Sequence, residues 1–338
     1  MPERLTDAWS LGPHRVPNRV LLAPLAGIGT WFVRLQARRY GAGMAVSEMV
    51  SSFAIHHRNA KTMTELLRIH PDERDAVPPA PISIQLFGQD PDVMRSAAET
   101  VAAAGADVID INMGCPVPKV CKTGAGAALI KDPDTAVEVA KAAAEASGLP
   151  VTVKLRSGQR PGETDGFALA HRLVDEAGVA AIAFHPRSAA VHHKGEPDYE
   201  LAARLVATLG APVILTGGLR SAEQVVAAYE RTGVAAVMLA RGSLGNPWLF
   251  ERLLGLRDSE PSAEDVLVEL TWLTERAVEH LGEPRATGWL RKAYPWYVER
   301  LGVVGVQAKE LNAVLLRSDS IEHALSLVRD SRPLLAAA

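Results

Sequence analysis

The chain has 338 residues, of which 48% are hydrophobic and 22% charged, and 36 Lys and Arg against 39 Asp and Glu give a formal net charge of −3. This composition excludes a disordered chain, and it excludes a polycation that binds nucleic acid through its overall charge. Two cysteines are too few for a disulfide scaffold or a four-thiolate metal site. The N-terminus lacks a signal-peptide pattern and no apolar run is long enough to cross a membrane, so we expect a soluble cytoplasmic protein.

Short apolar runs without polar alternation recur along the chain, which is typical of parallel strands that are buried on both faces. Between them lie helical patterns with recognisable ends. Asp90-Pro91 predicts a helix start, and Ser221 with Gln224 has the spacing of a capping box before a helix that should end at Gly233. The predicted strands are Val20–Ala23, Met44–Ser47, Ile82–Leu86, Val108–Asn112, Val151–Lys154, Ala181–Phe184, Val213–Thr216 and Ala236–Leu239.

Strands that alternate with helices in this number predict an α/β fold, a (β/α)8 TIM barrel. A doubly wound parallel sheet is the alternative, but its glycine-rich first turn is missing from the segment 23–27 (APLAG). From Ser262 onward the patterns are helical, without strand candidates. We therefore expect a barrel over residues 1–255 and a smaller all-helical C-terminal domain over residues 262–338. Its segment 285–332 is locally basic, which is typical of a solvated helical face or of an RNA contact.

Active sites of barrel enzymes lie at the C-terminal ends of the strands. Nearly every predicted strand here is followed by polar or glycine-containing residues, which favours an active-site rim. These residues are Pro24-Leu25-Ala26, Glu48, Gln85, Asn112 with Cys115, Lys154 with Arg156, His185 with Arg187, Thr216-Gly217-Gly218 and Arg241-Gly242.

The segments after the last two strands predict a phosphate site. The loop Thr216-Gly217-Gly218 and the loop 240–242 can bring backbone N–H groups close to an anion, at the usual phosphate position of this fold. A sugar phosphate and a flavin nucleotide both fit this pattern. Lys154 should enter the barrel mouth and need an anionic or electron-accepting partner. A reduced flavin is one such partner, and a Schiff-base lysine or a salt bridge to a nearby carboxylate are the alternatives.

Cys115 lies in a Gly- and Pro-containing loop just beyond the fourth predicted strand. A lone cysteine is usually a small buried hydrophobe, but a loop at the catalytic end is where a reactive thiol is expected. Cys121, six positions later, is interpreted as a packing residue. The pairs His56-His57 and His192-His193 lack metal-ligand spacing, so no metal is expected.

The segment 112–120 (NMGCPVPKV) and its continuation 124–129 (GAGAAL) resemble the signature of the tRNA-dihydrouridine synthases, above all the bacterial B-type branch. Further similar segments occur in the right order between Leu21 and Phe250, and a looser similarity to the family's RNA-binding domain lies at 291–297 (RKAYPWY). The supporting segments are 23–27 (APLAG), 47–49 (SEM), 83–88 (SIQLFG), 153–156 (VKLR) and 241–248 (RGSLGNPW).

The resemblance implies an FMN enzyme that uses NADPH to reduce the C5–C6 bond of particular uridines in tRNA. It implies Cys115 as the catalytic acid, Gln85 and Lys154 at the pyrimidine edge of the flavin, and Asn112, Arg156 and Arg187 near the flavin and the substrate base. The implied FMN-binding residues are Pro24, Leu25, Ala26, Gln85, Lys154, His185, Thr216, Gly217, Gly218, Ala240 and Arg241. Arg291 and Lys292 are the implied RNA contacts.

Two positions depart from the family pattern. Thr216-Gly217-Gly218 stands where the B-type branch usually has Asn-Gly-Asp, and Pro186 replaces a usual glycine, which removes an N–H donor. Two other functions are also compatible with these residues. One is a flavin barrel enzyme that acts on a free small molecule, such as a dihydroorotate or dihydropyrimidine dehydrogenase. The other is a non-catalytic RNA-binding relative.

Overall fold

The computed structural model describes residues 4–302 and 305–331. The chain divides into two compact units, residues 1–241 and 242–338. The boundary between the predicted domains, 1–255 and 262–338, lies at least 14 residues further along the chain than the boundary between these two units. Residues 303–304 and 332–338 of the predicted helical domain, Arg332 of its basic segment included, lie outside the described residues.

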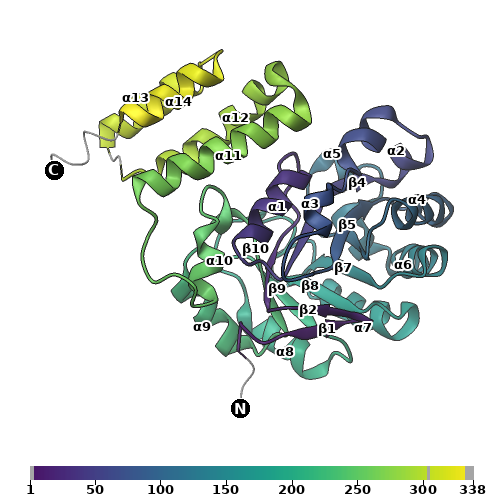
Figure 1. Ribbon diagram of the computed structural model, residues 1–338. Coiled ribbons are helices and arrows are strands. Elements are labelled where there is room, and N and C mark those ends of the chain that lie inside the picture. Colours follow the sequence, from purple (N-terminus) through teal and green to yellow (C-terminus); the bar gives the residue numbers. More distant parts are fainter. Residues whose placement is uncertain (1–3, 303–304, 332–338) are drawn as a thin grey trace. The chain divides into compact units, whose positions relative to one another are not determined.

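The first unit is a closed barrel of parallel strands in the order β10-β3-β4-β5-β6-β7-β8-β9, and this confirms the predicted (β/α)8 fold (Figure 1). The barrel closes where β10 pairs with β3, and there Ala23 N donates to Leu239 O at 2.7 Å. Each predicted apolar run is a strand, because its side chains are buried on both faces. The strands are β3 (Val20–Leu22), β4 (Met44–Ser51), β5 (Ile82–Phe87), β6 (Val108–Met113), β7 (Val151–Arg156), β8 (Ala181–His185), β9 (Val213–Thr216) and β10 (Ala236–Leu239).

Helices follow the strands and cover the barrel on the outside, as Figure 1 shows for α4, α6 and α7. They are α1 (Trp31–Arg39), α2 (Ser52–His56), α3 (Pro71–Arg74), α4 (Pro91–Ala103), α5 (Pro118–Cys121), α6 (Pro133–Ser147), α7 (Asp165–Ala177), α8 (Tyr199–Thr208) and α9 (Ala222–Thr232). Shorter turns are η1 (Thr62–Leu66), η2 (Gly126–Lys131) and η3 (Arg241–Ser243).

Side-chain caps fix the helix starts that the sequence predicts. Asp90 accepts from the backbone N–H groups of Asp92 and Val93 at the start of α4. Ser221 accepts from Gln224 N at the start of α9, but Gln224 Oε1 accepts from Arg220 N, so the predicted reciprocal box does not form.

A two-stranded antiparallel hairpin, β1 (Trp9–Leu11) and β2 (His14–Val16), precedes the barrel and was not predicted. Trp9, Leu11 and Val16 share one buried cluster with barrel residues that include the first residues of four strands, Met44, Val108, Ala181 and Ala236. The hairpin therefore covers the N-terminal end of the barrel. The opposite end, where the strands carry their polar residues, is left for ligands.

The second unit is helical throughout residues 242–302 and 305–331, apart from turns. Ser262 and Asp265 form a reciprocal capping box at the start of α11. Tyr294 and Tyr297 of α12 are almost fully buried in its core. Its helices are α10 (Trp248–Leu253), α11 (Ala263–Leu281), α12 (Glu283–Val298), α13 (Gly305–Leu315) and α14 (Ile321–Asp330). Across the described residues of both units, no helix is long and apolar enough to span a membrane.

Candidate active site

The barrel mouth gathers the polar residues that end the strands. Parallel strands end at the same rim, and the register places Asn112 of β6 beside Lys154 of β7. Gln85, Asn112, His185 and Thr216 are all buried, and Lys154 is half-buried. Buried polar groups at neighbouring strand ends make this rim the candidate active site of the first unit.

The loop after β6 holds Cys115 through its backbone. Asn112 Oδ1 accepts from Cys115 N at 2.9 Å and from Gly114 N at 3.3 Å. Cys115 O accepts from Ala127 N at 3.0 Å and from the thiol of Cys121 at 3.3 Å. Cys115 itself is half-buried. A fixed backbone at a partly exposed residue is an arrangement that suits a proton donor.

Glycine is required beside this cysteine. A Cβ on Gly126 would lie 2.8 Å from Cys115 O, and the residue has a φ of +63°. The backbone of η2 can therefore approach the Cys115 loop closely enough to hydrogen-bond it.

Arg156 connects two loops of the mouth. Its Nε donates to Gly114 O at 2.9 Å, and its Nη1 donates to Ser188 O at 3.0 Å and to His192 O at 2.7 Å. Burial lowers the pKa of the Arg156 guanidinium to about 10. Because all three acceptors are backbone carbonyls, Arg156 keeps its charge uncompensated and orders the loops after β6 and β8.

Lys154 adds a second buried cation. Burial, with a smaller contribution from the charge of Arg156, lowers the pKa of its ammonium to about 8, while Asp110 acts in the opposite direction. The ammonium has no hydrogen bond or ion pair among residues 4–302 and 305–331. An ammonium held without a partner is costly, and an anionic ligand would remove that cost.

The cost of the buried Lys154 ammonium predicts a pH-dependent stability for the ligand-free protein. Between about pH 8 and pH 10.4, the ordinary pKa of an unfolded lysine, Lys154 is protonated in the unfolded chain but largely deprotonated in the folded one. The free energy of unfolding should therefore rise with pH in this range. Lys154→Met should abolish that rise and be more stable than wild type at pH 7, by roughly 2–3 kcal/mol. Urea unfolding at pH 7 and pH 10 measures both effects.

The control is Lys119→Met at an exposed lysine, which should unfold at wild-type urea concentrations. A Lys154→Met protein that is less stable than wild type at pH 7 would contradict the absence of an internal partner.

His185 is neutral in this cluster. Burial lowers the pKa of its imidazole far below the ordinary value, and the charges of Lys154, Arg156 and Arg187 add to that effect. His185 Nε2 lies 3.1 Å from Arg187 Nη1, so this nitrogen accepts and the other carries the proton. Arg187 also donates from Nη2 to Gly195 O at 2.6 Å. These bonds fix the ring at the mouth.

The loop after β9 approaches His185 so closely that only glycine fits. A Cβ on Gly217 would lie 2.3 Å from His185 Cδ2, and one on Gly218 would lie 2.5 Å from Tyr199 Oη. Both residues have positive φ, +100° and +80°. Tyr199 Oη donates to Gly217 O at 3.1 Å, which fixes this loop to the first residue of α8.

Two exposed arginines follow the last two strands. Charge repulsion by Arg220 and Arg187 adds to burial in lowering the pKa of Arg241. Neither the Arg220 nor the Arg241 guanidinium has a hydrogen bond or ion pair among the described residues. Arg220 was not among the predicted site residues, although a basic residue two positions after a Gly-Gly pair is a signal for it. The guanidinium groups of Arg220 and Arg241, together with the backbone N–H groups of Gly217 and Gly218, are hydrogen-bond donors that suit a phosphate.

The loop after β3 is shaped by its own backbone. Leu25 O accepts from Ile28 N and Gly29 N, and Glu48 Oε2 accepts from Gly27 N at 2.8 Å. Leu25 is buried, Pro24 is half-buried and Ala26 is exposed. Ala240, half-buried, directly follows β10, the strand that pairs with β3. Among the described residues, no group of three or more His, Cys, Asp or Glu is placed to hold a metal ion.

The predicted RNA residues lie on α12 of the second unit and differ in their surroundings. Arg291 donates to Ser318 O at 3.0 Å from Nη2 and pairs with Asp319, so its guanidinium has internal partners. Lys292 is exposed, without a hydrogen bond or ion pair among the described residues. Trp296 packs against Gly245, where a Cβ would lie 2.6 Å from its own Cβ.

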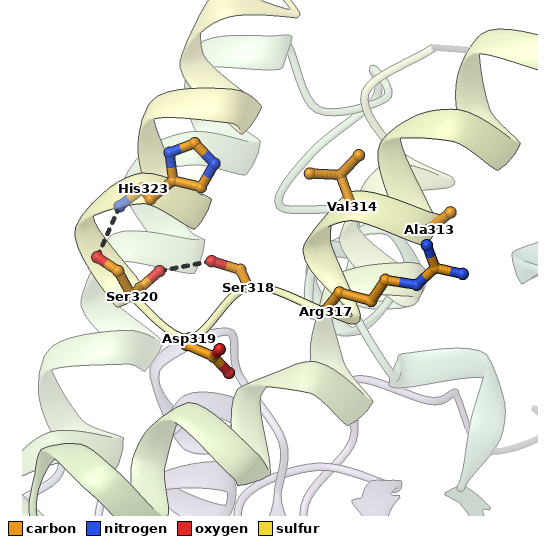
Figure 2. Close-up of a pocket in the computed structure, with 7 residues that line it drawn as sticks. All are labelled: Ala313, Val314, Arg317, Ser318, Asp319, Ser320 and His323. Atoms are coloured by element: carbon orange, nitrogen blue, oxygen red, sulfur yellow. Dashed lines mark hydrogen bonds between the residues drawn. The ribbon is translucent and has the colours of Figure 1, made fainter.

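A pocket of about 500 Å³ lies at the turn between α13 and α14. Figure 2 shows the side chains that line it. Ser320 Oγ accepts from His323 N, and Ser318 Oγ donates to Ser320 O, so the turn itself is ordered. The Arg317 guanidinium has no partner within the described part of the chain. The lining residues are Ala313, Val314, Arg317, Ser318, Asp319, Ser320 and His323.

The profile of the dihydrouridine synthase (Dus) family matches residues 21–320. The chain belongs to the dihydrouridine synthase family. A relative from Pseudomonas aeruginosa named tRNA-dihydrouridine synthase B is 36% identical over 296 residues, which cover 86% of this chain and 87% of the relative. A tRNA-dihydrouridine synthase B from Xanthomonas campestris is 34% identical and covers 95% and 94% of the two chains. A probable tRNA-dihydrouridine synthase 1 from Synechocystis is 34% identical and covers 94% and 90%.

Solved structures similar to this dihydrouridine synthase family member share its fold. Morphinone reductase in complex with tetrahydroNAD, as the N189A mutant, has a TM-score of 0.55 at 17% identity and covers 78% of this chain and 94% of its own. The old yellow enzyme homologue from Zymomonas mobilis has a TM-score of 0.56 at 16% identity, with 76% and 94% covered. At these identities the likeness supports the barrel fold alone.

Proposed function

We propose that this member of the dihydrouridine synthase family reduces the C5–C6 bond of uridines in tRNA to 5,6-dihydrouridine, with FMN as cofactor and NADPH as reductant. The observation that carries the proposal is the Cys115 loop, fixed by Asn112 and Arg156 beside a group of uncompensated cations. Family membership and relatives named tRNA-dihydrouridine synthase B support the same reaction. NADPH rests on the family resemblance alone.

The residues of the first unit fit FMN. Gly217 and Gly218 form a backbone cradle that no other residue could form, and the unpaired Arg220 and Arg241 suit the phosphate. Lys154 suits the charge that a reduced flavin carries at its pyrimidine edge, because this ammonium has no internal partner. In the proposal, Gln85, His185, Thr216, Ala240 and the backbone of Pro24, Leu25 and Ala26 line the rest of this site.

FMN held by the Gly217-Gly218 loop and Lys154 would supply the hydride for C6 of the uracil ring. The protein supplies the second hydrogen: the Cys115 thiol donates its proton to C5, and the thiolate regains a proton from water. Asn112 holds the backbone of Cys115, so the thiol stays at one position during transfer. Arg156 and Arg187 order the surrounding loops through backbone carbonyls, and the uracil must leave its stack to reach this site.

Two measurements test this function. The purified protein should be yellow and release FMN on denaturation, and a protein that fails to take up added FMN would contradict the proposed cofactor. Dihydrouridine mapping of tRNA from cells with and without the gene should show loss at defined positions. Unchanged dihydrouridine together with reduction of a free pyrimidine would favour a small-molecule dehydrogenase.

RNA contacts are proposed for the second unit. The residues to test are the cations whose side chains have no partner among the described residues. Lys292→Ala and Arg317→Ala each remove a cation without an internal partner, so each should weaken tRNA binding and reduce the slope of log K against log salt concentration by about 0.7–0.9. Filter binding at several salt concentrations measures both quantities.

The matched comparison is Arg291→Ala, which also removes a hydrogen bond to Ser318 and an ion pair to Asp319. We therefore expect it to lower the stability of the second unit as well as tRNA affinity. If Lys292→Ala and Arg317→Ala leave affinity and salt slope unchanged, the RNA site lies elsewhere.

A further inference from the structure

A carboxylate lies inside the barrel, in a strand that is otherwise apolar apart from Asn112. Asp110 of β6 is 1% exposed and faces the neighbouring strands β5 and β7. Its Oδ1 accepts from Thr152 Oγ1 at 2.6 Å, and its Oδ2 accepts from Gln85 Nε2 at 2.6 Å. Burial raises the pKa of Asp110 to about 6, while these two hydrogen bonds and the charge of Lys154 act against the rise. Burying a carboxylate inside the barrel costs free energy, and its hydrogen bonds to Thr152 and Gln85 offset part of that cost. We therefore expect the role of the carboxylate to lie in the groups that it contacts.

The carboxylate fixes the direction of a chain of hydrogen bonds. An ionised carboxylate only accepts, so Gln85 must turn its Nε2 toward Asp110. Gln85 Oε1 is then directed to Asn112 and accepts from its Nδ2 at 2.9 Å. Asn112 in turn must point its Oδ1 at the next loop, where it accepts from Cys115 N. Each amide has one orientation because the preceding group allows only one.

We propose that Asp110 is a positioning residue that sets the amide orientations of Gln85 and Asn112, and through them the backbone of Cys115. Its Oδ1 is held by Thr152, which leaves Oδ2 for Gln85. In this arrangement Gln85 presents its Oε1 as an acceptor at the mouth, so a ligand with an N–H group, such as the pyrimidine edge of FMN, is favoured there. This last step rests on the proposed function.

Asp110→Asn is the informative variant, because an amide can donate to Gln85 Oε1 and so permits the flipped orientation. In a Cys121→Ala background Cys115 is the only thiol of the chain. There, Asp110→Asn should speed alkylation of Cys115 by iodoacetamide at least threefold in the ligand-free protein, because its loop loses its fixed acceptor. The same variant should weaken FMN binding about tenfold, the effect of one well-oriented hydrogen bond.

Thr152 gives a second test that does not alter the carboxylate. Thr152→Val should change both quantities in the same direction by a smaller factor, and Thr152→Ser, which keeps the donor, should restore wild-type values. Ser83→Ala is the matched control. Ser83 is buried in β5 two residues before Gln85, and its hydroxyl has no hydrogen-bond partner among the residues that the structure describes. Its removal should change neither alkylation nor FMN affinity.

The outcomes separate this inference from the proposed function. Alkylation and FMN affinity that stay at wild-type values in Asp110→Asn and Thr152→Val would overturn the role of Asp110. If Asp110→Asn does not fold, Thr152→Val compared with Thr152→Ser decides. A wild-type protein that binds no FMN would contradict the proposed cofactor, whereas the alkylation result would still decide the role of Asp110.

Discussion

Replacing Cys115 with alanine should reduce dihydrouridine formation by about 10²–10⁴-fold, the usual contribution of a general acid. FMN binding and NADPH oxidation should continue, because the thiol acts only on the uracil. The backbone of residue 115 should keep its place, since Asn112 Oδ1 and Ala127 N bind main-chain atoms that alanine retains. Single-turnover reduction of tRNA by the pre-reduced enzyme measures the affected step.

Cys121→Ala is the matched control. Cys121 is also half-buried, and its thiol donates to Cys115 O at 3.3 Å, a weak hydrogen bond whose loss should leave the rate within a few-fold of wild type. A normal rate in Cys115→Ala together with a large loss in Cys121→Ala would assign the proton donor to the other cysteine.

Gly217→Ala should have the second large effect, on both stability and FMN binding. Its Cβ would lie 2.3 Å from His185 Cδ2 and 2.4 Å from Nε2, and its φ of +100° is strained for alanine. The His185 ring cannot move freely because it is buried and bonded to Arg187. Overpacking and backbone strain together should cost about 2–4 kcal/mol of unfolding free energy. FMN affinity should fall more than tenfold as the cradle shifts.

Gly233→Ala separates strain from overpacking. Gly233 ends α9 with a φ of +65°, and nothing lies within 4 Å of a Cβ built there. That variant should lose only about 1 kcal/mol and bind FMN normally. Equal losses in the two variants would mean that the contact with His185 is unimportant.

The barrel was predictable because parallel strands buried on both faces leave a local signal. Val108–Asn112 and Val213–Thr216 read as apolar runs, and the structure has strands there. The hairpin of Trp9–Leu11 and His14–Val16 was missed because three-residue strands are too short for a period to be recognised. It is held by contacts with strand starts far along the chain.

The candidate site was predictable where a residue type follows a strand end, and not where partners are distant in sequence. Asp110 occurs inside an apolar run, so only the structure reveals its bonds to Gln85 and Thr152. Arg291 was predicted to contact RNA from the family resemblance and from its place in a locally basic segment. Its bond to Asp319, on a later turn, is a tertiary contact that no local pattern contains.

Barrel closure between β3 and β10 also sets an order of events during synthesis. Leu22 pairs with Leu239, so one edge of β3 has no partner until nearly all of the first unit has been made. At typical translation rates this interval lasts roughly 10–40 s. The waiting edge consists of Val20, Leu21 and Leu22, all apolar, and unpaired apolar edges readily join other chains. Of the barrel strands, β3 therefore has the longest exposure to aggregation on the ribosome.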